Sequence, residues 1–325
     1  MRKKLRGLLN QDAGMVAVAA AMGLVAFLAS AALALDMGHL LSVQNELQRA
    51  ADAGAMAGAR GLWPGTLPII ASTPPPDCTT AQNRALSAAT NPGNQVDGGT
   101  SVSADVTVQV GRWNYNTKTF TPGCSSNTNA VQVTIQRNNI HTMFAAFLGM
   151  ATTNRTATST AVMDFAQGVG KGAMPIAISL TYAAPGQILF IDFNPEGKGG
   201  WFAAPPDSAS AQTFQNYVDQ GSCPPLNVGN LISLANGTDA SVLHDLKDKL
   251  QAQGSTWDTV LPVVNTEVFN QSEPIVGFLP FRITAVDDTG NPKGVTGTVL
   301  GLLESATAAP GGLNYGVLAP PKMVN

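Results

Sequence analysis

The hydrophobic pattern begins with a basic cluster followed by a long apolar run. The cluster contains Arg2, Lys3, Lys4 and Arg6, and the run from Ala13 to Leu35 has no charged side chain. A helix of that length covers about 35 Å, enough to cross a hydrocarbon core of about 30 Å. The basic residues then keep the N-terminus in the cytoplasm and export the remainder. We therefore expect a cytoplasmic tail at 1–12 and a transmembrane helix at 13–35.

A cleaved signal peptide is the competing interpretation of this run. Ala32-Leu33-Ala34 has the small-x-small pattern of a cleavage site. The run is longer than the apolar core of a typical signal peptide, and the helical pattern continues beyond the candidate site. These two features favour an uncleaved, single-pass anchor.

An amphipathic helix is predicted at 36–62, because no proline occurs before Pro64. Apolar and small residues recur every three or four positions, so they form one stripe. Its members are Leu40, Val43, Leu47, Ala50, Gly54, Ala57 and Gly58. Asn45, Gln48, Arg49 and Asp52 are expected on the opposite, solvated face. The stripe packs either against the chain's own body or, as a docking stripe, against like helices in an assembly.

The residues after this helix alternate between strand and helix patterns. After a proline-rich linker at 61–76, a first strand-rich region is expected at 63–170. Its predicted elements are a helix at 79–89, a strand at 102–110, a hairpin connection at 111–123, a strand at 130–135, a short apolar helix at 141–149 and a strand at 152–165.

A second α+β region is expected at 171–325, because the glycine-rich segment 167–172 marks a boundary. Its predicted strands lie at 175–180, 187–193, 260–268, 275–286 and 294–303, and its predicted helices at 208–219 and 239–251. The predicted fold class is therefore α+β, with a long N-terminal membrane-spanning helix followed by strand-rich exported domains.

The charge and cysteine content of the chain bear on its partners and on its compartment. Charged residues make up 12% of the chain and the formal net charge is -3, which does not indicate a nucleic-acid partner. The cysteines are Cys78, Cys124 and Cys223, with no C-x-x-C pair. In an oxidising compartment, proximity along the chain favours a disulfide between Cys78 and Cys124, and it leaves Cys223 buried or free.

Candidate catalytic and metal-binding motifs are weak. His39, His141 and His244 lack the spacing of a metal site, and no G-x-S-x-G elbow occurs. The glycine–lysine turns at 170–172 and 197–199 lack the remainder of a phosphate-binding loop, and 287–291 fits a hairpin tip better than a calcium loop. We expect no enzymatic activity, no metal and no cofactor.

The segment from Ala34 to Arg60, ALDMGHLLSVQNELQRAADAGAMAGAR, carries a specific pattern. An acidic residue, a small residue and a polar stretch follow the apolar run, and they are followed by the alanine-rich pattern L-Q-x-A-A-D-A-x-A-x-A-G-A. This segment resembles the N-terminal part of Tad/Flp pilus-assembly proteins of the TadE/TadG-like type. The matching residues are Asp36, Gly38, Leu47, Gln48, Ala50, Ala51, Asp52, Ala53, Ala55, Ala57, Gly58 and Ala59. The later GRWN and NAVQVTIQR segments are also similar to TadG-related proteins.

Two departures refine the resemblance. Processed pilins of this kind have a glutamate five residues after the cleavage glycine, whereas Gly14 is followed at that spacing by Ala19. Some TadG proteins have a metal-binding D-x-S-x-S motif, and the nearest segment here, beginning at Asp192, lacks both serines. Neither pilin processing nor that metal site is expected.

The resemblance implies a structural component of a bacterial Tad (Flp) adhesive pilus system. It implies an inner-membrane location, a periplasmic or otherwise exported body, and contact through the N-terminal helix with pilus machinery or like subunits. Two alternatives stay open: an exported hydrolase whose site is not visible in the sequence, and a surface adhesin or binding module.

Overall fold

The computed structural model describes residues 2–64, 74–100, 105–237 and 239–324. Parts of the predicted linker and of the predicted strand at 102–110 lie outside these residues. The chain divides into two compact units, each assembled from separate segments. Unit 1 contains residues 1–54, 86–108 and 133–159, and unit 2 contains residues 55–85, 109–132 and 160–325.

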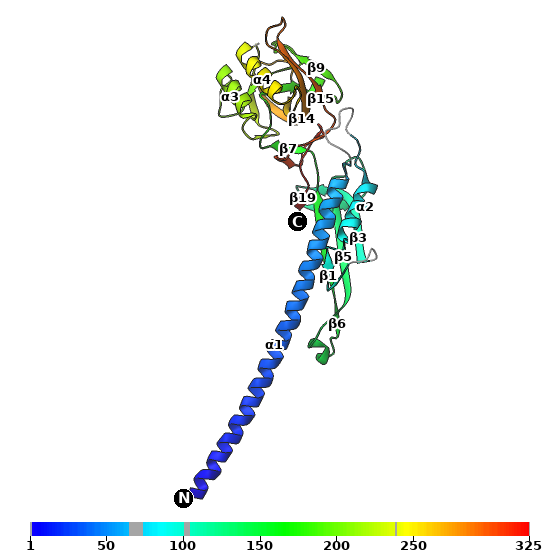
Figure 1. Cartoon of the computed structure of the whole chain (residues 1–325), viewed down its shortest axis with the longest axis vertical. Coiled ribbons are helices and arrows are strands. Elements are labelled where there is room, and N and C mark those ends of the chain that lie inside the picture. Colours follow the sequence, from blue (N-terminus) through cyan, green and yellow to red (C-terminus); the bar gives the residue numbers. More distant parts are fainter. Residues whose placement is uncertain (1, 65–73, 101–104, 238, 325) are drawn as a thin grey trace. The chain divides into compact units, whose positions relative to one another are not determined.

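One continuous helix, α1 (Arg2–Gly61), begins the chain (Figure 1). Alanine and leucine are strong helix formers and no proline interrupts the segment, so the helix continues well beyond the apolar run. In that run the side chains of Met22 and Phe27 are 63% and 69% exposed. By length and composition this helix is apolar enough to cross a membrane. The predicted long N-terminal helix and α+β class are confirmed.

A five-stranded sheet follows in the order β19-β6-β5-β3-β4. Its strands are β3 (Val106–Asn114), β4 (Thr119–Pro122), β5 (Ala130–His141), β6 (Thr152–Val162) and β19 (Lys322–Val324). Val131, Val133 and Ile135 alternate with polar residues and are fully buried, which explains the strand at 130–135. β5 and β6 are connected through a one-turn 3₁₀ helix, η2 (Ala145–Leu148), so the predicted helix at 141–149 is shorter than expected.

The C-terminal strand β19 pairs with a strand of the first predicted region. Lys322 pairs with Val162 and Val324 with Thr160, so the end of the chain completes the sheet of the first predicted region. Strand pairing brings together residues far apart in sequence, which a division into consecutive segments does not capture. The consecutive boundaries at 63–170 and 171–325 stay a prediction.

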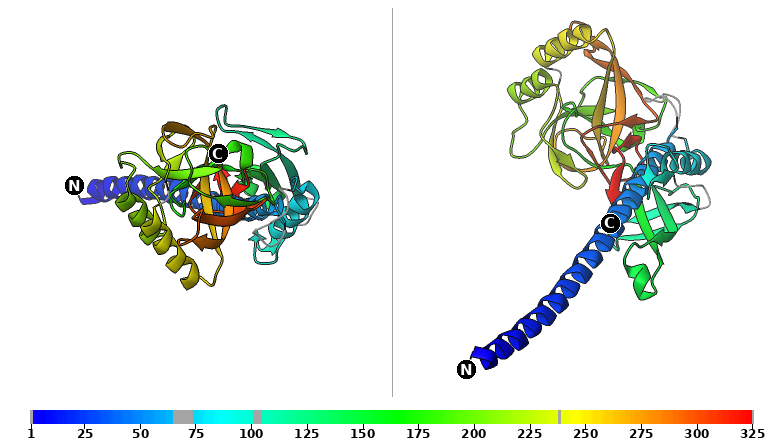
Figure 2. Two further views of the ribbon diagram at one scale, coloured as in Figure 1. Left: turned by 90° about the horizontal axis from the view of Figure 1, so that it is seen from above. Right: turned by 60° about the horizontal axis from the view of Figure 1, so that its bottom comes forward.

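A seven-stranded sheet lies within unit 2, in the order β12-β10-β8-β13-β14-β15-β9. Its strands are β8 (Ile176–Ser179), β9 (Ile188–Ile191), β10 (Gly199–Ala203), β12 (Leu231–Ala235), β13 (Trp257–Val264), β14 (Ser272–Asp287) and β15 (Gly294–Val299). The helices α3 (Ala211–Gln220) and α4 (Ala240–Ala252) lie side by side and pack on this sheet (Figures 1 and 2).

The core between these helices and the sheet is apolar and dense. Phe193 stacks on Trp201 with ring centroids 4.0 Å apart, and Trp201 also stacks on Phe214 of α3. The Trp201 indole donates to the Gly237 carbonyl, which satisfies its buried N–H. Short pairings complete the fold: β1 (Gln95–Val96) with β2 (Gly99–Thr100), β7 (Ala166–Val169) with β11 (Leu226–Asn227) and β17 (Ala308–Pro310), and β16 (Leu303–Glu304) with β18 (Val317–Leu318).

The last turns of α1 pack closely on the helix α2 (Cys78–Ala89) within unit 2. A Cβ added to Gly58 would lie 2.7 Å from Val131 Cγ1 and 2.9 Å from Ala85 Cβ. One added to Gly61 would lie 2.8 Å from the Ala81 Cα. Only glycine permits this approach of the two backbones.

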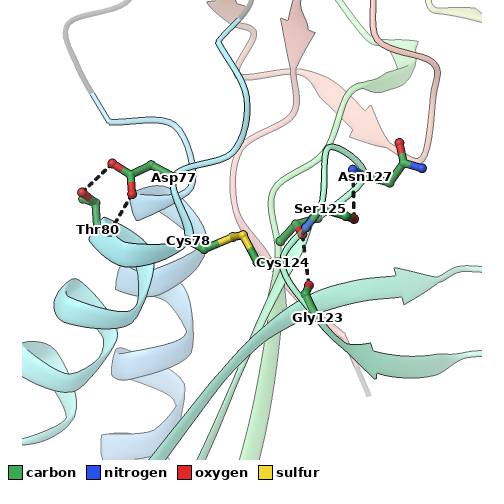
Figure 3. The surroundings of a disulfide bond; sticks show 8 residues. Asp77, Cys78, Thr80, Gly123, Cys124, Ser125 and Asn127 are labelled. Carbon is green, nitrogen blue, oxygen red and sulfur yellow. Dashed lines mark hydrogen bonds between the residues drawn. A yellow bond between two sulfur atoms is a disulfide. The ribbon is translucent and has the colours of Figure 1, made fainter.

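A disulfide between Cys78 and Cys124 attaches the start of α2 to the segment after β4 (Figure 3). Beside it, Asp77 accepts hydrogen bonds from the Thr80 amide and hydroxyl, at 2.8 and 2.7 Å, and so caps the helix. With 46 residues of sequence separation, such a crosslink stabilises the fold by about 4 kcal/mol in the chain-entropy model.

We expect Gly58→Ala to lower the free energy of unfolding by about 1–3 kcal/mol, because the new methyl group overpacks the contact with α2 and β5. Gly38→Ala is the matched control, since a Cβ there meets nothing within 4 Å. That change should be neutral or stabilising by about 0.5–1 kcal/mol. Denaturant unfolding of the full chain in detergent measures both, and equal midpoints for the two variants would contradict the expectation.

Candidate interaction sites

The predicted stripe on α1 is largely buried by the chain itself. Val43, Leu47, Ala50, Gly54 and Gly58 are buried, while Leu40 and Ala57 are half-buried. Ala51, Ala55 and Ala59 are buried as well, so the small residues form a wider face than the stripe drawn from the sequence. This burial favours the first of the two interpretations, an intramolecular packing face. The burial does not support the second, a docking stripe open to a partner.

Asp36, the acidic residue that directly follows the apolar run, holds the segment between β5 and β6 within unit 1. Its carboxylate is 5% exposed and accepts backbone N–H bonds from Met143 at 2.8 Å, Phe144 at 3.0 Å and Ala145 at 2.6 Å. Three amides that precede or begin η2 are thereby satisfied by one side chain. Charge-assisted bonds of this kind are stronger than neutral ones.

Other polar residues of the same helix hold further segments of unit 1. Glu46 accepts from the Asp97 amide at 2.9 Å, and His39 lies 3.3 Å from the Asp97 carboxylate. Asp52 accepts from the hydroxyl of Ser159 and from the side-chain amide of Gln48, both at 2.7 Å. Gln48 and Asp52 are half-buried, so their expected place on a solvated face was wrong.

We call Asp36, Glu46 and Asp52 the acidic clamp, because each bonds to a separate segment of unit 1. The sequence placed Asp36 and Asp52 in a family pattern and Asp52 on a solvated face, and it indicated none of these long-range contacts. A signal was present nonetheless: acidic residues are scarce on a helix that is otherwise apolar or small.

Unit 2 contains a second candidate site, a cavity of about 500 Å³. We call it the polar pocket. Its lining residues are Arg112, Trp113, Asn114, Tyr115, Asn116, Ser126, Asn127, Thr128, Asn129, Asp164, Phe165, Gly311, Gly312, Leu313 and Asn314. Ligand pockets in proteins have volumes of about 300–1,000 Å³, so this cavity is large enough for a small molecule.

The back of the polar pocket is a fixed hydrogen-bond network around Asn129. Its side-chain oxygen accepts from the Trp113 amide at 2.7 Å, and its nitrogen donates to Asp164 Oδ2 at 2.7 Å. Asp164 Oδ1 accepts from the Phe165 amide at 2.8 Å. The other asparagine side chains, at positions 114, 116, 127 and 314, are exposed at the rim.

Burial raises the pKa values of two side chains in the polar pocket, Asp164 and Tyr115. It raises the pKa of Asp164 above its usual range, against the opposing effect of the Asn129 amide. Burial, together with the neighbouring Asp164 carboxyl, also raises the pKa of Tyr115. The Tyr115 hydroxyl is buried beside that carboxyl. The pocket therefore presents mainly neutral donors and acceptors, with Arg112 and Asp164 as its ionisable groups besides Tyr115.

The remaining candidate residues are not brought together. His244 lies 3.0 Å from Asp288 on the surface of unit 2, and His39 belongs to the contact with Asp97. Cys223 is a buried free thiol whose pKa is raised by burial. Within the described ranges, no three His, Cys, Asp or Glu side chains lie close enough to hold a metal ion.

We expect Asp36→Ala to accelerate amide exchange in the segment 142–151 of the full chain by roughly ten- to hundredfold, because three amides lose their buried acceptor. Asp36→Asn keeps one acceptor oxygen and should give an intermediate rate. Asn45→Ala, on the exposed side of the same helix, should leave exchange unchanged. Hydrogen exchange with mass spectrometry measures all three, and unchanged protection in Asp36→Ala would rule out the clamp.

The part of the chain that follows Asp52 is similar to a known protein family. Residues 57–161 match a family model described as "Putative Tad-like Flp pilus-assembly". The match includes α2 and the strands β3 to β6, whereas most of the ALDMG…AGAR segment precedes it. No curated protein and no solved structure matches the chain. The predicted resemblance is confirmed: the match at 57–161 is consistent with a Tad-related family.

Proposed function

We propose that the protein is a membrane-anchored structural component of a Tad (Flp) pilus-assembly system. The observation that carries the proposal is the family match at 57–161, which begins within the last turn of a helix whose earlier part can cross a membrane. A pilus-assembly role is supported by the family, and the membrane anchor is supported by the length and composition of α1.

The proposed anchor is the uncharged run at 13–35. Large apolar side chains in it are exposed, including Val25, Leu28 and Leu33, and a bilayer would cover them. The helix passes through Ala32-Leu33-Ala34 without interruption, which supports an anchor that is retained rather than removed. The basic N-terminus supports a cytoplasmic tail and an exported body.

The proposed mechanism is positional. One unbroken helix carries both the anchor and the acidic clamp, so the segments held by Asp36, Glu46 and Asp52 stay at fixed distances from the membrane. The chain itself buries most of the stripe at 40–58. Contacts with pilus machinery or with like subunits would therefore use other surfaces. The proposed role requires no catalytic residue.

We expect piliation and surface attachment to depend on the anchor. In cells that lack the gene, the unchanged chain should restore surface pili, and its mass should show that residues before Asp36 are retained. A chain whose segment 13–35 is replaced by a cleavable signal peptide should restore neither pili nor attachment.

The matched control replaces 13–35 by an unrelated transmembrane helix of equal length, which should restore both. Normal piliation in cells without the gene would contradict the pilus role. Normal piliation with the released body would contradict the need for an anchor.

The polar pocket favours a second candidate function, a binding module for a neutral saccharide. Asparagine amides both donate and accept hydrogen bonds, which suits the hydroxyl groups of a sugar, and Trp113, Tyr115 and Phe165 supply apolar ring surface. Glycoside hydrolysis commonly uses two carboxyl groups, whereas the lining residues include one, Asp164. The observation therefore supports binding more than hydrolysis.

We expect neutral mono- and oligosaccharides to perturb the NMR signals of the pocket amides in the full chain. Asn116→Ala and Asn314→Ala each remove a hydrogen-bonding group at the rim, so affinity should fall roughly two- to tenfold. Asn45→Ala, which lies outside the pocket, should bind as the unchanged chain does. The absence of any perturbation across the saccharide panel would exclude this function.

A further inference from the structure

An exposed apolar cluster lies in the connection between β5 and β6, within unit 1. Phe147 is 88% exposed, Met143 70%, Met150 58% and Phe144 38%. We call these four residues the apolar tip. Side chains of this size are seldom left together in water, and a contiguous exposed apolar patch commonly marks a contact with a protein or a membrane.

The apolar tip is a folded structure. Phe147 donates its amide to the Phe144 carbonyl at 3.1 Å, and Met150 donates to Ala145 at 3.0 Å. Gly149 closes the turn with a positive φ of 87°, and Thr142 donates to the Ala151 carbonyl at 3.1 Å. The backbone therefore fixes these side chains in an outward-facing position.

Asp36 determines where on α1 the tip lies. The amides of Met143, Phe144 and Ala145 all donate to its carboxylate, and Asp36 directly follows the last residue of the uncharged run. Leu35 and Met37, on either side of Asp36, are 62% and 61% exposed. The apolar tip is thus attached to the point at which α1 changes from apolar to amphipathic.

We infer that the apolar tip inserts into the exported-side interface of the bilayer that holds α1. This inference rests on the proposed anchor: if 13–35 spans the membrane, Asp36 lies at the end of the hydrocarbon core, and side chains bonded beside it lie at the same depth. The partner is a lipid surface, and the tip provides a second point of contact with it.

The chemistry of the connection fits this depth. No Asp, Glu, Lys or Arg occurs from Thr142 to Asn154, so no charged side chain has to enter the interface. Arg155, the first charge after the tip, lines a shallow pocket with Met37, Leu40, Leu41 and Gln44. Leu40, Leu41 and Gln44 lie about one to two helical turns beyond Asp36. At that depth the Arg155 guanidinium would meet the phosphate groups of the lipids.

With two contacts, rotation and tilt of the body at the membrane would be restricted. A single helix leaves the exported residues free to turn about its axis. A side contact at the interface, held by three hydrogen bonds to that helix, opposes this rotation. The clamp at Asp36 would then serve to place the tip, and η2 would be an interfacial anchor.

Depth-dependent fluorescence quenching tests the inference on the full chain. Single substitutions to tryptophan are made at Phe147, at Leu24 within the uncharged run, and at Asn45, nine residues beyond Asp36 along α1. The protein is reconstituted in vesicles of phosphatidylethanolamine and phosphatidylglycerol that contain lipids brominated near the top or near the end of the acyl chains. Emission is compared with that of the unchanged chain, whose four tryptophans supply the background.

We expect shallow bromines to quench F147W more than deep ones do, L24W to be quenched at depth, and N45W to be quenched little. Adding Asp36→Ala to F147W should reduce its quenching, because the tip loses its attachment to α1. If F147W is quenched no more than N45W while L24W is quenched, the tip lies in water or against protein and the inference fails. If L24W is not quenched, the proposed anchor itself fails and the inference fails with it.

Discussion

The structure depends on the close approach of α1 to the rest of its own chain. Alanine and glycine on the helix permit that approach, and at Gly58 even one methyl group would collide with Val131 and Ala85. Because the helix carries both the uncharged run and the buried face, the same rigid element that can enter a membrane is also part of the folded body.

Polar contacts fix the position of α1 along its own axis against the segments that it packs on. A face of alanine and glycine slides easily, because neighbouring small side chains are similar in shape. Asp36, Glu46 and Asp52 each bond to a separate segment of unit 1, so only one position of the helix satisfies all three. Breaking such a contact leaves a carboxylate or an amide without its partner, which makes displaced arrangements costly. The apolar tip is one consequence, since its amides are fixed by the first of these residues.

The two candidate surfaces differ in chemistry and suggest different partners. The apolar tip has no Asp, Glu, Lys or Arg in its own segment, 142–154, and it is bonded through Asp36 to a helix that is long and apolar enough to span a membrane. The polar pocket has amides at its rim and a fixed network at its back, and it belongs to unit 2. Both include residues of the family-matched segment 57–161, so both proposed contacts would use the Tad-related part of the chain.

The sequence by itself determined the long helix, the α+β class, the longest strands and the resemblance to Tad-related proteins, because these depend on periodicity and on local pattern. It also pointed to the pairing of Cys78 with Cys124 through proximity along the chain. Only the tertiary structure decided that the stripe is buried, that Gln48 and Asp52 are half-buried, and that residues 322–324 join the first sheet. A helical pattern shows which residues share a face, but it does not show what covers that face. The partners of Asp36 lie more than a hundred residues away in sequence, and only folding brings them within hydrogen-bonding distance.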